Sequence, residues 1–169
     1  MRIAILLLAA GIAQAQPIPA SKALEKLRAL AGEWQGTLEW SGARTGTGTL
    51  KASYHLAGNK SAVIEDLMMG DDRDPSMMSV YHLDGADLRM THYCAAQNQP
   101  RLKATRIDDN GIAFTFVDAT NLAAQPAHVE AVEIRFVSPE KLILEFTFDT
   151  RGKKSVEHIE LKRVGSAKA

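Results

Sequence analysis

The fold class is decided by a stretch of strict alternation, Gly32-Glu33-Trp34-Gln35-Gly36-Thr37-Leu38-Glu39-Trp40. Its even-numbered residues are apolar or glycine, and its odd-numbered residues are polar. Because successive side chains of a strand point to opposite faces, this pattern predicts a half-buried strand with Trp34 and Trp40 facing inward. The same period of two continues through most of the chain, which predicts an all-β protein.

Turn sequences divide the rest of the chain into short alternating runs. Asp84-Gly85 and Asn110-Gly111 are strong turn signals, because both dipeptides favour the tight turns of β-hairpins. No two runs are separated by a helical crossover, which excludes a parallel sheet. The expected strands cover residues 33–40, 47–56, 62–69, 77–83, 88–94, 101–107, 111–117, 129–137, 142–148 and 155–163.

About ten antiparallel strands joined by short turns are best accommodated by closing the sheet on itself. An open meander would leave two exposed edges, whereas an up-and-down barrel leaves none. A barrel of this strand number is wider than its own side chains can fill, so we expect an internal cavity. The alternative is a two-sheet sandwich with a solid core. The prediction is therefore an all-β, up-and-down antiparallel barrel over residues 32–164.

Residues 1–15 have the features of a signal peptide. Arg2 is positively charged, residues 3–10 are apolar, and Ala13-Gln14-Ala15 offers the small residues of a cleavage site. The apolar run is too short to span a bilayer, for which roughly 20 residues are needed. We expect an exported protein, periplasmic or secreted, whose mature chain begins near Gln16 and does not insert into the membrane.

The segment between the signal peptide and the first strand is expected to form a tether and a short helix, over residues 16–31. Ser21 is expected to cap a helix over residues 22–31. Leucines spaced by three residues give this helix one apolar face, so it should lie against the barrel. At the other end of the chain, residues 165–169 are expected to be a loose tail.

Composition limits the classes of partner. The chain has 169 residues with 20 basic and 20 acidic side chains, and its formal net charge is zero. This length suits one domain with its own core. The balanced charge gives no footprint for nucleic acid or for an anionic membrane. Cys94 is the only cysteine, so the chain cannot form an internal disulfide.

The most distinctive chemistry lies in the predicted strand that ends at Cys94. Alternation places His92 and Cys94 together on its apolar face. Imidazole and thiolate suit zinc or copper, with His82 of the neighbouring strand as a third ligand. A simpler alternative is that His92 forms a hydrogen bond within the core and that Cys94 fills space.

An enzyme that uses Cys94 as nucleophile and His92 as base is a further alternative. Residues two apart on a strand point in parallel, which is poor geometry for transferring a proton between them. No nucleophile elbow, phosphate-binding loop or zinc-protease motif occurs in the sequence. The residues therefore favour binding over catalysis.

Two short motifs resemble known families. Gly32-Glu33-Trp34-Gln35-Gly36 resembles the Gly-x-Trp-x-Gly motif that opens the first strand of lipocalin-like and nitrobindin-like barrels. Thr91-His92-Tyr93-Cys94 with Asn98-Gln99-Pro100-Arg101 resembles a motif of uncharacterised exported bacterial proteins with a lipocalin-like domain. The resemblance covers nearly all of the mature chain and implies a barrel, and the second motif implies no activity.

The resemblance to nitrobindin-like barrels also implies haem binding through a histidine near the last strand. The candidate in this chain is His158. Alternation, however, places His158 on the face of Glu160 and Lys162, opposite the apolar face of Ile159 and Leu161. Only a β-bulge would turn its imidazole inward.

The function that we favour from the sequence is binding of a small, largely apolar molecule inside the barrel. His92, supported by His82, Asn98 and Arg101, would hold the polar group of the ligand. A non-catalytic interaction protein of the cell envelope, with a filled barrel, is the alternative. The sequence identifies no cofactor and no oligomeric state. The expected wall of the binding site consists of Trp34, Leu38, Trp40, Tyr54, Leu144 and Phe146.

An alternative role for Arg101 is that of a surface residue in an ion pair. It follows Pro100 at a predicted rim of the barrel, where it could pair with one of the acidic residues of the loop over residues 70–75 instead of holding a ligand. Arg106 is the other cation near this strand. Asn98 could likewise satisfy the backbone of its own turn.

Overall fold

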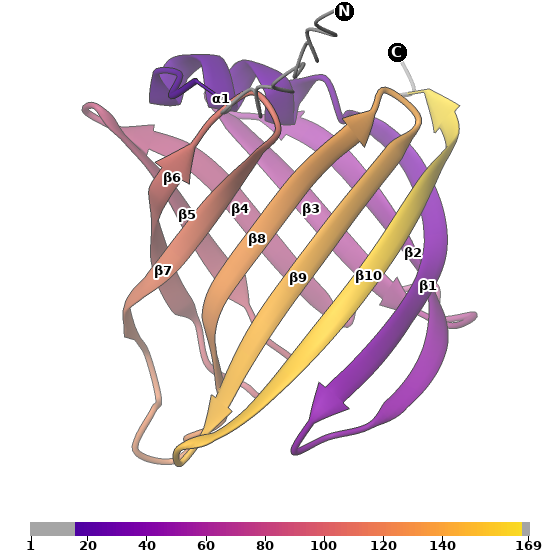
Figure 1. Cartoon of the computed structure of the whole chain (residues 1–169), viewed down its shortest axis with the longest axis vertical. Helices are drawn as coiled ribbons and strands as arrows, with labels where there is room; N and C mark the ends of the chain where they lie inside the picture. Colours follow the sequence, from indigo (N-terminus) through magenta and orange to yellow (C-terminus); the bar gives the residue numbers. More distant parts are fainter. Residues whose placement is uncertain (1–15, 167–169) are drawn as a thin grey trace, which may run out of the picture.

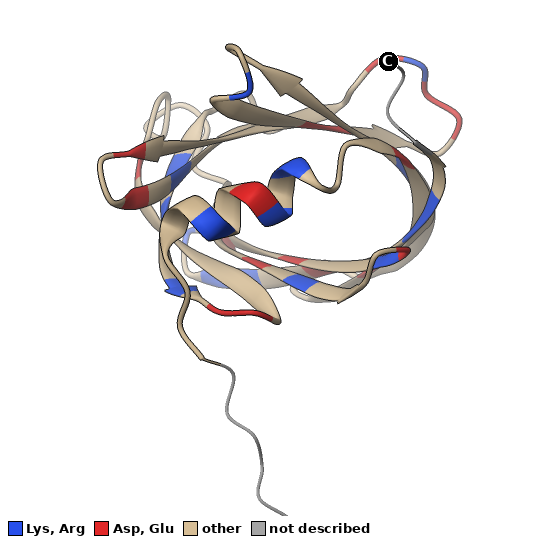
Figure 2. Cartoon of the chain, turned by 90° about the horizontal axis from the view of Figure 1, so that it is seen from above, with Lys and Arg blue, Asp and Glu red and all other residues tan. Residues whose placement is uncertain are grey.

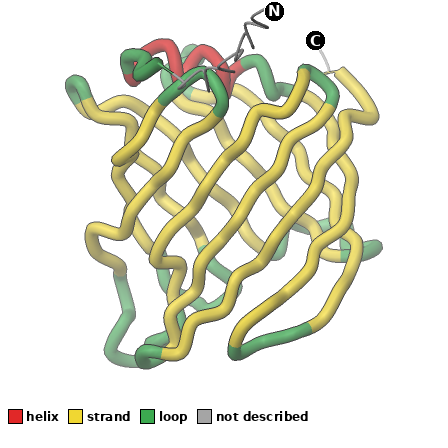
Figure 3. Tube along the Cα trace, viewed as in Figure 1, coloured by secondary structure: helices red, strands yellow, loops and turns green. Residues whose placement is uncertain are grey.

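The computed structural model describes residues 16–166. The predicted signal peptide, residues 1–15, lies outside the described residues. The described part consists of one helix and ten strands that form a closed barrel (Figures 1 and 3). Within it, no helix combines the length and the apolar composition that crossing a membrane requires.

Each strand pairs antiparallel with its neighbour in sequence, and β1 pairs with β10 to close the barrel. This closing pair runs from Gly32 opposite Ser166 to Gly42 opposite Ser155. The predicted ten-stranded up-and-down barrel is confirmed, and the sandwich alternative is wrong. The strands are β1 (Gly32–Gly42), β2 (Gly46–Ala57), β3 (Ala62–Met69), β4 (Met77–Asp84), β5 (Asp87–Tyr93), β6 (Pro100–Ile107), β7 (Gly111–Ala119), β8 (His128–Ser138), β9 (Lys141–Thr150) and β10 (Lys153–Ser166). Strand β10 thus extends into the segment expected as a loose tail.

Helix α1 (Ala20–Arg28) lies across one end of the barrel, as the view along the barrel shows (Figure 2). Its Leu24 and Leu27 are buried in the core, so the amphipathic face covers this end. The predicted capping role of Ser21 is wrong: the N-cap is Pro19, whose carbonyl accepts hydrogen bonds from the backbone N–H groups of residues 22 and 23.

Trp34 connects the helix to the barrel. Its indole Nε1 donates to the carbonyl of Leu30 at 2.8 Å, and the guanidinium of Arg163 stacks on the other part of the ring system at 4.3 Å from the centroid. The guanidinium also donates to the carbonyls of Ala29 and Ala31. Trp34 and Arg163 therefore join the segment after α1 to β1 and β10, the two strands that close the barrel.

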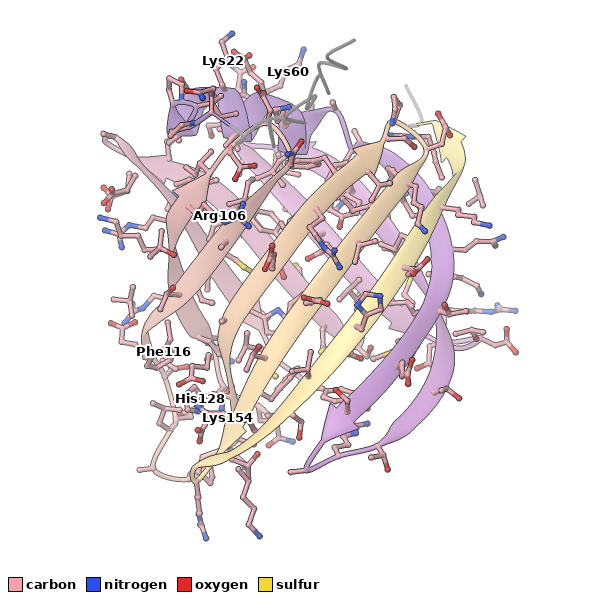
Figure 4. All side chains as sticks on the ribbon, in the orientation of Figure 1. Lys22, Lys60, Arg106, Phe116, His128 and Lys154 are labelled. Carbon is pink, nitrogen blue, oxygen red and sulfur yellow. The ribbon has the colours of Figure 1, made fainter. Side chains whose placement is uncertain are left out.

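Next to α1 the interior contains buried side chains such as Leu24, Leu27, Trp34 and Tyr54. Figure 4 labels Lys22 and Lys60 at the α1 end and His128 and Lys154 at the opposite end, which we call the open end. Strands β1, β3, β5, β7 and β9 run toward the open end. No helix of residues 16–166 covers this end, where strands are joined by turns and loops.

Candidate functional site

A pocket of about 620 Å³ lies at the open end. It is bounded by the last inward side chains of several strands, such as Trp40 of β1, Cys94 after β5 and Phe148 of β9. The rings of Trp40 and Phe148 lie 5.0 Å apart, and the guanidinium of Arg44 stacks on Trp40 at 3.9 Å. The full lining is Trp40, Ala43, Arg44, Met69, Ser76, Met77, Cys94, Ala95, Ala96, Ala127, Phe148, Thr150, Lys153 and Ser155.

A second hollow, of about 480 Å³, lies on the outer face of the barrel beside β1. Its lining consists largely of solvated polar groups, among them Glu160, which is ion-paired with Lys141 at 2.8 Å. Among residues 16–166, none of those that line it has a buried polar atom without a partner. The pocket at the open end is therefore the candidate site.

Directly beneath this pocket lies a layer that contains polar side chains. Inward positions recur every second residue along a strand, so each lining residue has a neighbour of the same face one step deeper. The deeper neighbours of Met77, Cys94, Phe148 and Ser155 are Ser79, His92, Phe146 and Glu157. All four of these deeper residues are at most 1% exposed.

Glu157 is the site residue that the sequence reading missed. Its side chain is 0% exposed, and neither carboxylate oxygen has a hydrogen-bond partner among the described residues. Burial raises the pKa of Glu157 to about 7, against a lowering effect of the Arg44 charge. The signal was present in the sequence, because Glu157 shares the face of Ile159 and Leu161 in strict alternation.

His92 faces the interior, at 0% exposure. Its Nδ1 lies 3.0 Å from Ser79 Oγ, and its Nε2 has no partner among the described residues. The ring centroid lies 5.5 Å from that of Phe146, so the imidazole packs in an apolar wall. Burial lowers the pKa of His92 to about 4, which leaves the ring neutral at pH 7.

A row of cross-strand pairs orients His92. Tyr54 lies opposite Glu65, Glu65 opposite Ser79, and Ser79 opposite His92, which places one hydrogen-bonded layer across β2 to β5. The hydroxyls of Tyr54 and Tyr81 both donate to the Glu65 carboxylate, Tyr81 at 2.9 Å. Burial raises the pKa of Glu65, while hydrogen bonding by both tyrosines and Ser79 lowers it, and burial prevails.

This row leaves one ring nitrogen of His92 without a partner. Nδ1 is hydrogen-bonded to the Ser79 hydroxyl, and the tautomer of the ring decides which of the two is the donor. In either tautomer, Nε2 is a buried polar atom without a partner among the described residues. The sequence placed His92 on the inner face but gave no means of finding these partners.

Cys94 lines the pocket and is 9% exposed. Burial raises the pKa of its thiol, the backbone N–H of Ala96 at 3.4 Å from Sγ lowers it, and the charge of Glu157 raises it further. The thiol is therefore protonated at neutral pH, and the structure lends no support to a Cys94 nucleophile.

We expect Cys94 to react with iodoacetamide at pH 7 at least about ten times more slowly in the native protein than in urea, because the thiolate fraction and the access are both reduced. Mass spectrometry of timed samples measures the two rates. Equal rates would show that the thiol is neither buried nor raised in pKa.

His82 does not join the site, contrary both to its predicted part in ligand binding and to the alternative of a metal site. It lies opposite Arg89 in the β4–β5 hairpin and on the outer face, and its Nδ1 lies 3.1 Å from the carbonyl oxygen of Leu83. His92 lies opposite Ser79 instead, so the two imidazoles point to opposite sides of the sheet. Within residues 16–166, no three His, Cys, Asp or Glu side chains are grouped as metal ligands.

Arg101 also lies outside the pocket. Its guanidinium forms a two-point ion pair with Asp118 on the outer face, with Nη2 2.9 Å from Oδ2. The surface ion pair was foreseen as an alternative, but its partner is Asp118 of the neighbouring β7 strand and not the acidic loop over residues 70–75. Arg106 is similarly paired, with Asp108 and Glu133.

Asn98 is buried and holds the loops of the open end together. Its Nδ2 donates to the carbonyls of Gln125 and Ala127 at 2.8 and 2.7 Å. The backbone carbonyl of Asn98 accepts from the N–H of Cys94. Asn98 therefore positions the wall of the pocket instead of lining it.

Most of the predicted wall lies deeper in the barrel. Trp40 lines the pocket, whereas Trp34 and Tyr54 pack against each other at 6.3 Å in the core toward α1. His158 lies on the outer face, where its Nδ1 is 2.9 Å from Glu145 Oε1. The position that the haem hypothesis requires of His158 is thus contradicted.

No protein-family model and no curated protein matches the chain. Among solved structures, a protein of unknown function from the DUF3598 family of Nostoc punctiforme aligns with a TM-score of 0.56 and 12% identity, over 82% of this chain and 49% of that one. This chain therefore spans about half the length of that protein. Rv2717c from M. tuberculosis aligns with a TM-score of 0.55 and 15% identity, over 88% of this chain and 99% of that one. These likenesses concern the fold alone, which is the closed antiparallel barrel described above.

Proposed function

We propose that this protein binds a small, largely apolar molecule in the pocket at its open end. The observation that carries the proposal is the combination of a largely apolar pocket wall with buried, unpartnered polar atoms in the layer beneath it. Ligand sites of proteins typically combine a cavity of roughly 300–1,000 Å³, mainly apolar walls and a few convergent polar groups. The pocket of about 620 Å³ meets the first of these criteria.

The walls suit an apolar body. Trp40 and Phe148 offer flat surfaces, and Met69 and Met77 are flexible side chains that adapt to irregular shapes. The closed α1 end gives the barrel a single mouth, so the ligand would enter past Arg44. The signal-peptide features of residues 1–15 support the further proposal that binding occurs in the periplasm or outside the cell.

We expect Ser155→Trp to reduce the affinity for a bound apolar probe at least about tenfold, because the new indole would occupy the mouth. Val156→Trp is the matched control, since the adjacent residue points to the outer face. Quenching of tryptophan fluorescence and calorimetry measure binding of haem, palmitate, retinol and menadione. The absence of binding by all four probes would contradict the proposed function, as would equal affinities of the two variants.

A further inference from the structure

The layer beneath the pocket contains buried polar atoms without a partner. Both oxygens of Glu157 and the Nε2 of His92 have none among the described residues. The oxygens of an ionised carboxylate are acceptors only. A ligand that satisfies the ionised Glu157 must therefore bring N–H or O–H donors.

We infer that the ligand carries a cationic nitrogen, such as a protonated amine or an amidine, which enters below the aromatic rim and pairs with the carboxylate of Glu157. This inference rests on the proposed function and names the chemical class of its ligand. A protonated amine has several N–H donors, so it can donate to both oxygens of the carboxylate.

The energetics favour a cation at this position over a neutral group. A carboxylate that is buried without a partner is costly, and a hydrogen-bonded ion of opposite charge removes that cost. Arg44 influences Glu157 through its charge, but it is stacked on Trp40 and forms no hydrogen bond with the carboxylate. The carboxylate is therefore open to a partner supplied by the ligand.

The rim itself carries two positive charges, Arg44 and Lys153. Both side chains are exposed, so water screens them, and their effect on a bound group is weaker than that of a buried carboxylate. An anionic ligand held by these two cations is the competing outcome, and the experiment below distinguishes the two.

The charged and titratable groups that face Glu157 limit how its affinity depends on pH. They are Arg44 of the β1–β2 turn and Cys94 after β5, and His92 packs against Phe146, the residue opposite Glu157 on β9. Between pH 6 and 8 the thiol stays protonated and the imidazole stays neutral. Glu157 is then the group of this site that titrates, and the affinity for an amine should rise with pH through about 7.

The test compares three probes that share one apolar body: 4-phenylbutylamine, 4-phenylbutanol and 4-phenylbutyrate, measured by calorimetry at pH 8. We expect the amine to bind at least about tenfold more tightly than the other two. Glu157→Gln should remove this preference while it leaves the affinity for the alcohol within about twofold. Glu160→Gln is the matched control on the outer face of the same strand, and it should behave as the wild type.

The outcomes separate the inference from the proposed function. Alcohol binding without a preference for the amine, a preference that survives Glu157→Gln, or tighter binding of the butyrate would each overturn the inference alone. Absence of binding by all three phenylbutyl probes would also overturn it. If haem, palmitate, retinol and menadione fail to bind as well, the proposed function falls with it.

Discussion

Gly36→Ala is expected to destabilise the barrel by about 3 kcal/mol or more, because it inserts a methyl group where β1 and β10 meet. A Cβ at position 36 would lie 1.8 Å from the backbone oxygen of Glu160 and 2.8 Å from its carbonyl carbon. Both atoms belong to the backbone, so no side-chain rotation can relieve the contact. The two strands would have to separate at the pair that closes the barrel.

Urea denaturation followed by circular dichroism measures this loss. Gly48→Ala is the matched control on β2, since its Cβ would meet only the side chain of Leu38, at 3.6 Å. We expect the control to stay within about 1 kcal/mol of the wild type. A Gly36→Ala protein as stable as the control would mean that β1 and β10 do not approach this closely.

The second large effect concerns pH. Glu157 and His92 should contribute opposite slopes to the stability between about pH 4.5 and 6.5. The native Glu157, with its pKa near 7, holds a proton that the unfolded chain has released, so its contribution to stability falls as pH rises. The native His92, with its pKa near 4, lacks a proton that the unfolded chain holds, so its contribution rises with pH. In the wild type the two slopes largely cancel.

Single substitutions should reveal each slope. Raising the pKa of Glu157 from 4.5 to about 7 corresponds to about 3 kcal/mol, at about 1.4 kcal/mol per pH unit. Glu157→Gln should therefore gain about 3 kcal/mol on the wild type between pH 4.5 and pH 8. His92→Gln should show the reverse: its loss of stability relative to the wild type should shrink by about 3 kcal/mol as pH falls from 6.5 to 4, because the wild type alone is destabilised in this range.

Urea denaturation at intervals from pH 4 to pH 8, at constant ionic strength, measures both effects. Glu160→Gln serves again as the control, because the hydrogen bond and charge of Lys141 lower the pKa of this exposed carboxyl, in the direction opposite to the change at Glu157. If the stability of Glu157→Gln runs parallel to that of the wild type across this range, Glu157 is not the buried group that titrates near pH 7.

The sequence predicted whether a strand residue points to the inside or the outside of the barrel, and these assignments account for most of the fold. Alternation correctly placed His92 inside and His158 outside, and the hairpin turns indicated which strands are neighbours. Glu157 was overlooked although its alternation with Ile159 and Leu161 was equally clear. The reason is that a carboxylate is not expected on an apolar face, so only Ile159 and Leu161 were assigned to the inner face of this strand.

The sequence did not reveal which residues of neighbouring strands lie side by side. His82 was grouped with His92, although the β4–β5 register pairs His82 with Arg89. Arg101 is ion-paired with Asp118, which lies 17 residues further along the chain. A face depends on the local period of two, whereas a layer depends on the register of every strand pair around the barrel.

The sequence by itself determined a ten-stranded barrel with a defined inner face, because alternation and turn chemistry are local properties of the chain. The tertiary structure decided that α1 covers one end, that the pocket lies at the other, and that Glu157 and His92 lie beneath it. These features depend on the closure of β1 on β10 and on the stagger of all ten strands. Each depends on the register of all the strand pairs together, which no single stretch of residues specifies.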